Sequence, residues 1–478
     1  MFFVGSSGFL STHSTSELIW IGIAALVVFV TGGYFSFKIP KPVLLAILLG
    51  VAVLQVFEPI GYISIALLLP IVFAPAILRS SRRAHWNLWV MVLLAVLAWQ
   101  LVSVLWAAND GTWAQAVLST VSLVLCYLAA RQVVATRGGL TRALVIAAPV
   151  ILLEIALVVL FRFSPALEAL YLRSPIAALF SEPDVELIFS RVPQNVLDPD
   201  KAGGFLLNGN IASLLLAAVA FLYGYAYFRS RRRVLLVVAA AGLIGCVATG
   251  SKTALVLLIL LPSLTLFFLL LLRRSRAAFA LLGLVVVGFI VTVIVLASAG
   301  SPLISTSLRT LGERGQLWAL AGKGFLEHPF LGLGYGGWAG YLRENADAVF
   351  ASGRQFQDLP THNVIVQAWA DAGIPLAVLV VAAATIPIAV VIAELVRRRS
   401  QPVLSSSALG LGCLLIAIVW FFAHAMADTI GFFGENHTLP YFGVIVAVIY
   451  FEREQGARRE DAVAEAAEGS AIRSARPV

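Results

Sequence analysis

The stretch "TALVLLILLPSLTLFFLLLL", residues 253–272, decides the fold class of this chain. It holds twenty consecutive residues without a charged side chain, and about 20 apolar residues in a helix cross the hydrocarbon core of a bilayer. A helix satisfies all its backbone polar groups internally, as a lipid environment requires. We therefore expect a membrane-spanning helix at 253–272.

Similar segments recur along the whole chain. Of the 478 residues, 60% are hydrophobic and 12% are charged, with a mean hydropathy of +0.95, which leaves too few polar residues to cover a soluble protein of this size. We predict an all-α, polytopic transmembrane helix bundle of 12 or 13 helices, because two expected spans are short. The expected spans are 18–37, 42–57, 60–78, 86–106, 113–130, 143–161, 204–228, 234–249, 253–272, 277–298, 363–393, 404–427 and 438–451.

The connections between these spans alternate in charge. Lys and Arg in short loops favour the cytoplasmic side, so the basic connections predict which side each loop faces. The basic connections hold Lys38 and Lys41; Arg79, Arg82 and Arg83; Arg131, Arg137 and Arg142; Arg229 and Arg231 to Arg233; Arg273, Arg274 and Arg276; and Arg397 to Arg399. The other connections, two of them long, then face the outer side of the membrane, and we expect the N-terminus on the outer side and the C-terminus on the cytoplasmic side.

This topology also explains the composition. The net charge of +8 fits cytoplasmic loops beside anionic lipid headgroups, so membrane lipids are expected partners and no nucleic acid is required. Cys126, Cys246 and Cys413 fall inside expected spans and indicate neither a disulfide nor a metal site. The first apolar run lacks a basic n-region and a cleavage site, and we predict a retained helix there.

The spans and long connections divide the chain into six parts. The tail is charged and without aromatic residues, which is typical of a disordered or partly helical segment. The parts are N-terminal transmembrane helices at 1–161, an outer loop at 162–203, transmembrane helices at 204–298, a large and partly helical outer loop at 299–362, C-terminal transmembrane helices at 363–451 and a cytoplasmic tail at 452–478.

One polar stretch, "GERGQLWALAGKGFLEHPFLGLGYGG" at residues 312–337, interrupts the apolar pattern on the outer side. Arg314 lies four residues before Trp318, so both project from one face of a helix. The glycines from Gly332 to Gly337 allow a tightly turning backbone whose amides could approach a phosphate. Glycines are also frequent in turns for steric reasons alone.

Two further outer clusters hold histidines. In "THN", residues 361–363, the imidazole of His362 lies where membrane meets water and could accept a proton from a hydroxyl; alternatively it marks or caps the start of the next helix. His424 and Asp428 share a helix face at spacing i, i+4, which suits either an oriented imidazole or a structural pair. We favour the structural pair.

Three other charged positions are candidates. Lys252 in "ATGSK" lies at the outer mouth of a span, where a lysine also snorkels to headgroups without any further role. Arg191 belongs to the 162–203 loop, most of whose charges we interpret as solvated. In that loop "DPD", residues 198–200, predicts a turn rather than a metal site, because Pro199 separates the carboxylates. Glu154 falls inside a span near its outer end, and a carboxylate there is costly enough to indicate a site.

Four stretches from about Leu207 to Phe451 resemble, in order, the motifs of the O-antigen ligase and O-antigen polymerase superfamily, membrane glycosyltransferases of bacterial surface polysaccharides. The sequence departs from the family pattern at Lys252, where an arginine is usual, and at Thr253, where a glycine is usual. The stretches are "LLNGNIASLLLAAVA", "TGSKTALVLLILL", "GERGQLWALAGKGFLEHPFLGLGYGGW" and "THNVIVQAWADAGIPLAVLV".

The resemblance implies a GT-C-like bundle in a bacterial inner membrane, with the outer loops and the N-terminus in the periplasm. It also implies a substrate class. It implies an undecaprenyl-pyrophosphate-linked glycan as donor, with Arg314 and the basic residue Lys252 holding its pyrophosphate, and a histidine matching His362 that activates the acceptor. Arg191 is a further candidate for the pyrophosphate, and possible supporting residues are Asn363, Asp428, His424 and Glu154. The acceptor would be lipid A–core or a lipid-linked repeat unit. Neither a metal nor a cofactor is expected.

Three classes of function remain open at this point. The ligase and polymerase alternatives share this chemistry and differ only in the acceptor. A secondary transporter is the common alternative for a dozen helices, but its ionisable residues usually lie near the bilayer midplane, whereas the charges here concentrate at the outer face. A catalytically inactive scaffold is the third alternative.

Overall fold

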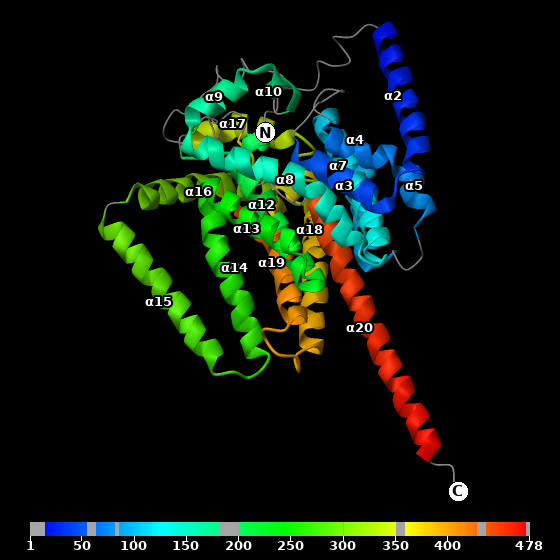
Figure 1. The fold of residues 1–478 in the computed structure, drawn as a ribbon. Helices are drawn as coiled ribbons and strands as arrows, with labels where there is room; N and C mark the ends of the chain where they lie inside the picture. The colour runs from blue at the N-terminus through cyan, green and yellow to red at the C-terminus, as the bar shows by residue number, and fades with distance from the viewer. Residues whose placement is uncertain are drawn as a thin grey trace.

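The computed structural model describes residues 15–54, 64–81, 86–180, 198, 200–299, 301–349, 359–427 and 436–474. Within these ranges every regular element is a helix (Figure 1). Seven helices are long and apolar enough to cross a membrane, and shorter apolar helices accompany them. The prediction of an all-α polytopic membrane protein is confirmed.

The N-terminal part is built from short and long helices packed together. Serine and asparagine side chains cap several of them, for example Ser64 before α4 and Asn87 before α6, because such side chains satisfy amides that a helix start leaves open. The elements are α2 (Thr15–Ser36), α3 (Lys41–Val53), α4 (Ile65–Val72), α5 (Ala74–Arg79), α6 (Leu88–Val102), η3 (Ser103–Trp106), α7 (Asp110–Val134) and α8 (Gly139–Phe163).

The remaining elements complete the bundle and its outer cover. The elements after α8 are α9 (Pro165–Leu172), α10 (Pro175–Phe180), η4 (Gly204–Leu206), α12 (Gly209–Ser230), α13 (Arg233–Ala248), α14 (Lys252–Leu271), α15 (Ala277–Ser298), α16 (Pro302–Glu327), α17 (Gly337–Val349), α18 (Val364–Arg397), α19 (Ser406–Ala427) and α20 (Leu439–Ser474). Helix α20 therefore continues through the expected tail to Ser474.

The core of the bundle is formed by α7, α12 and α20. The second half of α7 is buried almost throughout, as are most of α12 and the apolar start of α20 from Leu439 to Tyr450. These helices are apolar around their whole circumference, which is the pattern of a helix enclosed by others. By contrast, α14 and α15 expose many large apolar side chains, as a lipid-facing helix does.

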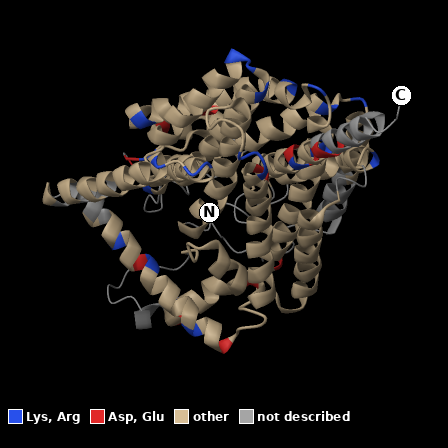
Figure 2. Cartoon of the chain, turned by 90° about the horizontal axis from the view of Figure 1, so that it is seen from below, with Lys and Arg blue, Asp and Glu red and all other residues tan. Residues whose placement is uncertain are grey.

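The two ends of the bundle differ in character. In Figure 1 the short helices α9 and α10 and the helices α16 and α17 lie toward the upper end, whereas the α14–α15 and α18–α19 turns lie at the lower end. The charged part of α20 projects beyond the bundle on this lower side (Figure 1). Most of the helical surface carries no charge (Figure 2). We call the lower side, which holds Arg273 and Arg397 to Arg399, the basic end.

Helix α18 is broken near its start. Ala372 and Gly373 leave helical geometry, and Gly373 has φ 78° and ψ −173°, a conformation that glycine alone adopts readily. The indole N–H of Trp99 on α6 donates to the carbonyl of Ala372 at 2.8 Å, which satisfies a carbonyl that the break frees. The result is a short first segment from Val364 to Asp371 that ends close to the outer elements.

Candidate active site

The "THN" turn forms the start of α18. The side-chain oxygen of Asn363 accepts from the amides of Ile365 at 2.9 Å and Val366 at 3.2 Å, so it caps the helix. Thr361 is fully buried, and its hydroxyl donates to the carbonyl of Asn363 at 3.0 Å. Between them His362 has φ 53°, a left-handed conformation that is uncommon for a residue with a side chain. The turn therefore holds His362 in one strained, partly exposed position.

Helix α16 is fastened to this turn. The indole N–H of Trp318 donates to the carbonyl of Thr361 at 2.9 Å, so the face of α16 that carries Trp318 lies against the residue before His362. Arg314 lies one turn earlier on that face and is half-buried. From α17, Trp338 donates to the carbonyl of Leu359 at 2.9 Å. The structure thus brings the Arg314 face of α16 to the histidine turn.

A second chain of polar contacts runs from the turn into α18. The hydroxyl of Thr361 lies 3.2 Å from Oε1 of Gln367, and Nε2 of Gln367 donates to Asp371 at 2.9 Å. These residues occupy the short segment before the break in α18. The sequence analysis did not select Gln367 or Asp371, although their spacing of four residues places them on one helix face.

The glycine-rich loop after α16 packs against protein instead of presenting its amides to a ligand. The amide of Leu333 donates to the carbonyl of Ala370 at 2.7 Å, and the amide of Gly332 donates to His328 at 3.1 Å. A Cβ on Gly332 would lie 2.1 Å from the carbonyl oxygen of Trp369. The amides of Gly332 and Leu333 are therefore already used within the protein, and close packing against the break in α18 explains the glycine at position 332.

His424 is enclosed between α12 and α18. The ring is fully buried, and Nε2 lies 3.3 Å from Oγ of Ser213 on α12. Nearby, Nδ2 of Asn363 donates to the carbonyl of Met426 at 3.4 Å. This position ties the end of α19 to the starts of α12 and α18. Asp428, expected beside His424, lies outside the described residues.

The "GSK" turn forms the start of α14 at the same end. Ser251 caps the helix and Lys252, its first residue, is exposed. Gly250 has φ 70°, and a Cβ there would lie 1.9 Å from the carbonyl oxygen of Asp200. The amide of Ala202 donates to the carbonyl of Thr249 at 3.2 Å. The loop before α12 is therefore held on this turn, and it brings Lys201, which the sequence analysis did not select, into the neighbourhood of Lys252.

Glu154 holds the other side of that loop. It is fully buried in α8, and Oε2 accepts from the amide of Phe205 at 2.8 Å. A Cβ on Gly204 would lie 2.5 Å from the same oxygen, so only glycine fits there. The contacts make Glu154 an anchor for η4. In the adjoining α9, burial and the nearby charge of Asp198 raise the pKa of Glu168 to about 7.

Three helix starts meet at this end of the molecule. The contact of Ser213 with His424 joins the start of α12 to the end of α19, and the bond from Asn363 to Met426 joins the start of α18 to the same end. The bond from Ala202 to Thr249 joins the loop before α12 to the "GSK" turn. A helix N-terminus carries partial positive charge, so the starts of α12, α14 and α18 each favour an anion. Among the described residues no group of three or more His, Cys, Asp or Glu could hold a metal ion. Arg191 lies outside the residues that the structure describes.

Comparison with known proteins gives a match to part of the chain. A protein-family model described as O-antigen ligase matches residues 236–381, from α13 into α18. The matched part contains Lys252, Arg314, His362 and Asn363, whereas Glu154 and His424 lie outside it. No curated protein matches the chain.

Proposed function

We propose, from the membership of residues 236–381 in the O-antigen ligase family, that this protein moves a glycan from undecaprenyl pyrophosphate to a lipid-anchored acceptor at the outer face of the bacterial inner membrane. The single observation that carries the proposal is the bond from Trp318 to the carbonyl of Thr361 at 2.9 Å. It brings a helix face with a permanent cation to the turn that carries His362. Such a pairing of cation and base is what transfer from a pyrophosphate requires.

The acceptor step falls to His362. Its imidazole takes the proton of the acceptor hydroxyl while the hydroxyl oxygen bonds to the anomeric carbon of the donor sugar. The strained turn between Thr361 and Asn363 limits the positions of the ring, which lowers the cost of orienting it for reaction. Asn363 supports the turn by capping α18.

The donor step needs cations. As the bond between the anomeric carbon and the pyrophosphate oxygen breaks, negative charge grows on the departing undecaprenyl pyrophosphate. Arg314 and Lys252 stabilise this charge. Arg191 is a further candidate for this role. Arg314 offers a planar fork that matches phosphate oxygens, whereas Lys252 offers a single ammonium group. One direct displacement inverts the anomeric centre, and the balanced products are the extended acceptor and undecaprenyl pyrophosphate.

The experiment compares variants of the full-length protein in liposomes that contain a polyprenyl-pyrophosphate-linked glycan and an acceptor. We expect His362→Ala and Arg314→Ala each to reduce transfer by about 100-fold, the typical contribution of a general base or an oxyanion-stabilising group. Arg309→Ala is the matched control, because Arg309 lies on the same helix, is 62% exposed and pairs with Glu313 at 3.9 Å. It should retain activity within about twofold.

The assignment fails if His362→Ala, folded and inserted as judged by gel filtration and thermal unfolding, transfers glycan at the normal rate. Ligase and polymerase are distinguished in a deletion strain. Loss of a ligase leaves long polymer on the lipid carrier, whereas loss of a polymerase leaves single repeat units. Lipid A–core is the acceptor in the first case and a lipid-linked repeat unit in the second.

A secondary transporter is the second candidate, favoured by the broken helix α18, because transporters often bind substrate at such breaks. Here, however, the break is filled by the glycine-rich loop: the amide of Ile374 donates to Pro329 at 3.1 Å, and Gly373 packs on the carbonyl of Phe330. Solute uptake driven by an ion gradient in protein-containing liposomes would support the transporter over the transferase.

A further inference from the structure

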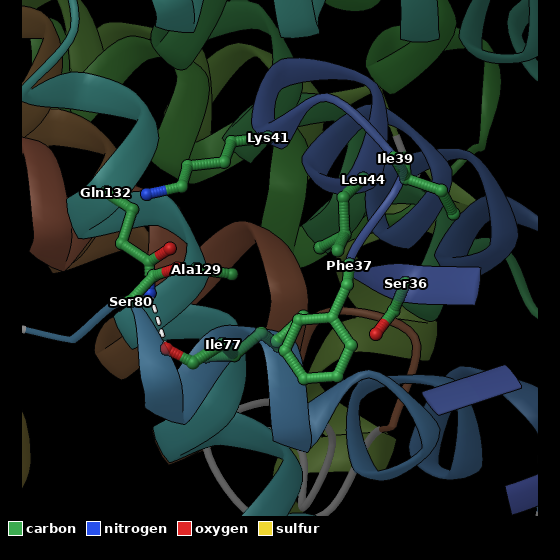
Figure 3. A pocket seen from close by; sticks show the side chains of 10 residues that line it. Ser36, Phe37, Ile39, Lys41, Leu44, Ile77, Ser80, Ala129 and Gln132 are labelled. Carbon is green, nitrogen blue, oxygen red and sulfur yellow. Dashed lines mark hydrogen bonds between the residues drawn. The ribbon is translucent and has the colours of Figure 1, made fainter. Parts of the chain in front are cut away.

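A cavity lies between the α2–α3 turn, α5 and α7, well away in the sequence from the residues of the candidate active site (Figure 3). Its cavity volume is about 70 Å³, and it opens to solvent. We call it the α3 pocket. Its lining residues are Ser36, Phe37, Ile39, Lys41, Leu44, Ala76, Ile77, Ser80, Ala129 and Gln132.

The lining of the α3 pocket combines one cation with polar and apolar groups. Lys41 is the first residue of α3 and is exposed, and Figure 3 shows its ammonium end directed toward Gln132. The amide of Gln132 is buried and fixed by donation to the carbonyl of Ile77 at 2.6 Å. Ser36 and Ser80 contribute hydroxyls. None of these lining residues is acidic, so the pocket favours a negatively charged occupant.

Two more cations flank the pocket. The ammonium nitrogen of Lys38 lies 4.8 Å from the centre of the Tyr34 ring, and the guanidinium of Arg79 lies 5.6 Å from the centre of the Phe37 ring. Cation–π contacts of this kind hold the charges near the pocket. Lys38 in the α2–α3 turn and Arg79 on α5 therefore add positive charge next to the residues that line the pocket.

An apolar surface adjoins this charged region. On α2 the side chains of Val30, Tyr34 and Phe35 are each 58–59% exposed, and Phe37 after the helix is 47% exposed. In a bilayer this surface meets acyl chains. The pocket and the helix together thus offer a site for a molecule with an anionic head and a hydrocarbon tail.

We propose that the α3 pocket binds an anionic phospholipid, with the headgroup phosphate at Lys41 and an acyl chain along the exposed face of α2. Basic pockets between transmembrane helices bind such headgroups in other membrane proteins. The site is separate from the proposed glycan transfer and does not depend on it. Free phosphate shares the headgroup chemistry but not the tail, which allows the two sources to be distinguished.

The test uses native mass spectrometry of the full-length protein released from detergent, titrated with phosphatidylglycerol, with phosphatidylcholine or with inorganic phosphate. We expect phosphatidylglycerol to bind more tightly than phosphatidylcholine. Lys41→Ala should weaken phosphatidylglycerol binding about fivefold, as expected for one basic residue near a membrane surface. Lys323→Ala is the control, because Lys323 is an exposed lysine on α16, and it should not change binding.

A second variant keeps the test independent of any folding effect at Lys41. Ser80→Asp places a negative charge on the pocket wall and should also abolish the preference for phosphatidylglycerol, while thermal unfolding in detergent reports that the fold is intact. Equal affinity for the two lipids in the unaltered protein would overturn the proposal. Retention of inorganic phosphate without any preference for phosphatidylglycerol would also overturn it, since the site would then recognise phosphate alone.

Discussion

Trp318 connects the two halves of the candidate active site through a single hydrogen bond. Its indole N–H reaches the carbonyl of Thr361, while Arg314 lies one turn away on the same helix face. His362 follows Thr361 directly and has a left-handed backbone. The distance between the proposed cation and the proposed base therefore depends on a residue that takes no part in the chemistry itself. Trp318 is a positioning residue.

Trp318→Phe keeps the aromatic ring but removes the N–H. We expect kcat for glycan transfer to fall about tenfold, because one lost hydrogen bond is worth about 1 kcal/mol and misplacement of reacting groups adds to it. Steady-state transfer in liposomes measures the effect. Trp338→Phe is the comparison, because it frees the carbonyl of Leu359 from α17 and leaves the bond from Trp318 to Thr361 in place. Equal losses in both variants would argue against a specific role for Trp318.

For single residues, the sequence predicts which side chains share one face of a helix. It does not predict which residues of other elements pack against that face. The spacing of Arg314 and Trp318 places both on one face, and α16 carries them as a helix should. The glycines at Gly332 and Gly334 suggested a phosphate-binding backbone. Their packing partners are backbone atoms of Trp369 and Trp106, and Trp106 lies more than 200 residues away in the chain. A contact between residues so far apart in the chain cannot be predicted from the local sequence around the glycines.

Among the elements, α18 is the one whose form matters most for the candidate site. It starts at the histidine turn, breaks after Asp371 and then continues to Arg397. The break is held from both sides, by Trp99 of α6 on the carbonyl of Ala372 and by the loop at Phe330 against Gly373. The short first segment is thereby fixed relative to α6 and α16 together.

Gly373→Ala tests whether this break is required. The new Cβ would lie 1.8 Å from the carbonyl oxygen of Phe330 at a φ of 78°, so both strain and overlap oppose it. We expect a loss of about 3 kcal/mol of stability, visible as a lower unfolding temperature in detergent. Gly340→Ala is the control, because nothing lies within 4 Å of its Cβ position and alanine favours a helix by up to about 1 kcal/mol. A Gly373→Ala protein as stable as the control would contradict this role.

The long spans could be predicted from sequence because a bilayer imposes both length and apolar character on them. The expected span at 253–272 is observed as α14 from Lys252 to Leu271. The expected span at 60–78 is instead observed as two short helices, α4 and α5, that meet at Phe73. The break in α18 was not predicted, because a glycine two residues before a proline also occurs in straight spans and the contacts that hold the break come from other elements.

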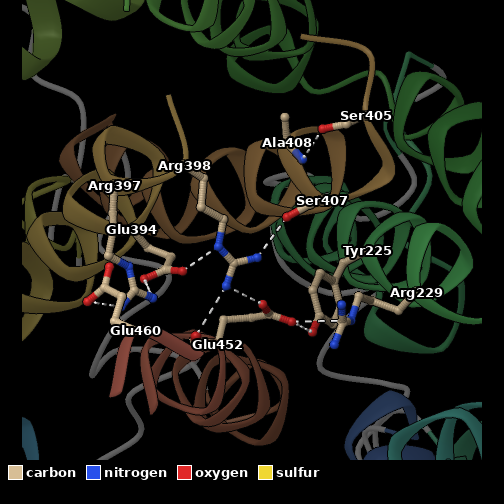
Figure 4. A network of polar contacts seen from close by, with 10 residues as sticks. All are labelled: Tyr225, Arg229, Glu394, Arg397, Arg398, Ser405, Ser407, Ala408, Glu452 and Glu460. Carbon is tan, nitrogen blue, oxygen red and sulfur yellow. Dashed lines mark hydrogen bonds and ion pairs between the residues drawn. The ribbon is translucent and has the colours of Figure 1, made fainter. Parts of the chain in front are cut away.

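At the scale of the whole molecule, the basic end is closed by a buried network of ion pairs (Figure 4). Glu452 on α20 accepts from Tyr225 at 2.7 Å and pairs with Arg398 at 3.0 Å and with Arg229 at 3.2 Å. Arg398 also pairs with Glu394, and it donates to Ser407 at 2.7 Å. One carboxylate thus joins α12, α18 and α20.

Glu452→Gln should destabilise the whole bundle. The change leaves Arg398 without one of its charge partners, and breaking a buried pair costs about 3–5 kcal/mol. Equilibrium unfolding in mixed detergent measures the loss. Glu460→Gln serves as the control, because Glu460 is 62% exposed and pairs with Arg397 at 3.4 Å, and an exposed pair contributes at most about 1 kcal/mol. Equal effects in the two variants would show that the network adds nothing beyond surface pairing.

The burial of α20 has a consequence for the biogenesis of the protein. This helix is synthesised long after α7, which ends at Val134, yet its residues from Leu439 to Tyr450 are enclosed and its Glu454 pairs with the buried Arg131 of α7. Helices synthesised earlier must therefore enter the membrane with a central place unfilled. Chains grow at about 5–20 residues per second, so α7 waits tens of seconds for its partner. The core of this bundle closes only after α20 has been synthesised, and the insertion machinery must protect the open core until then.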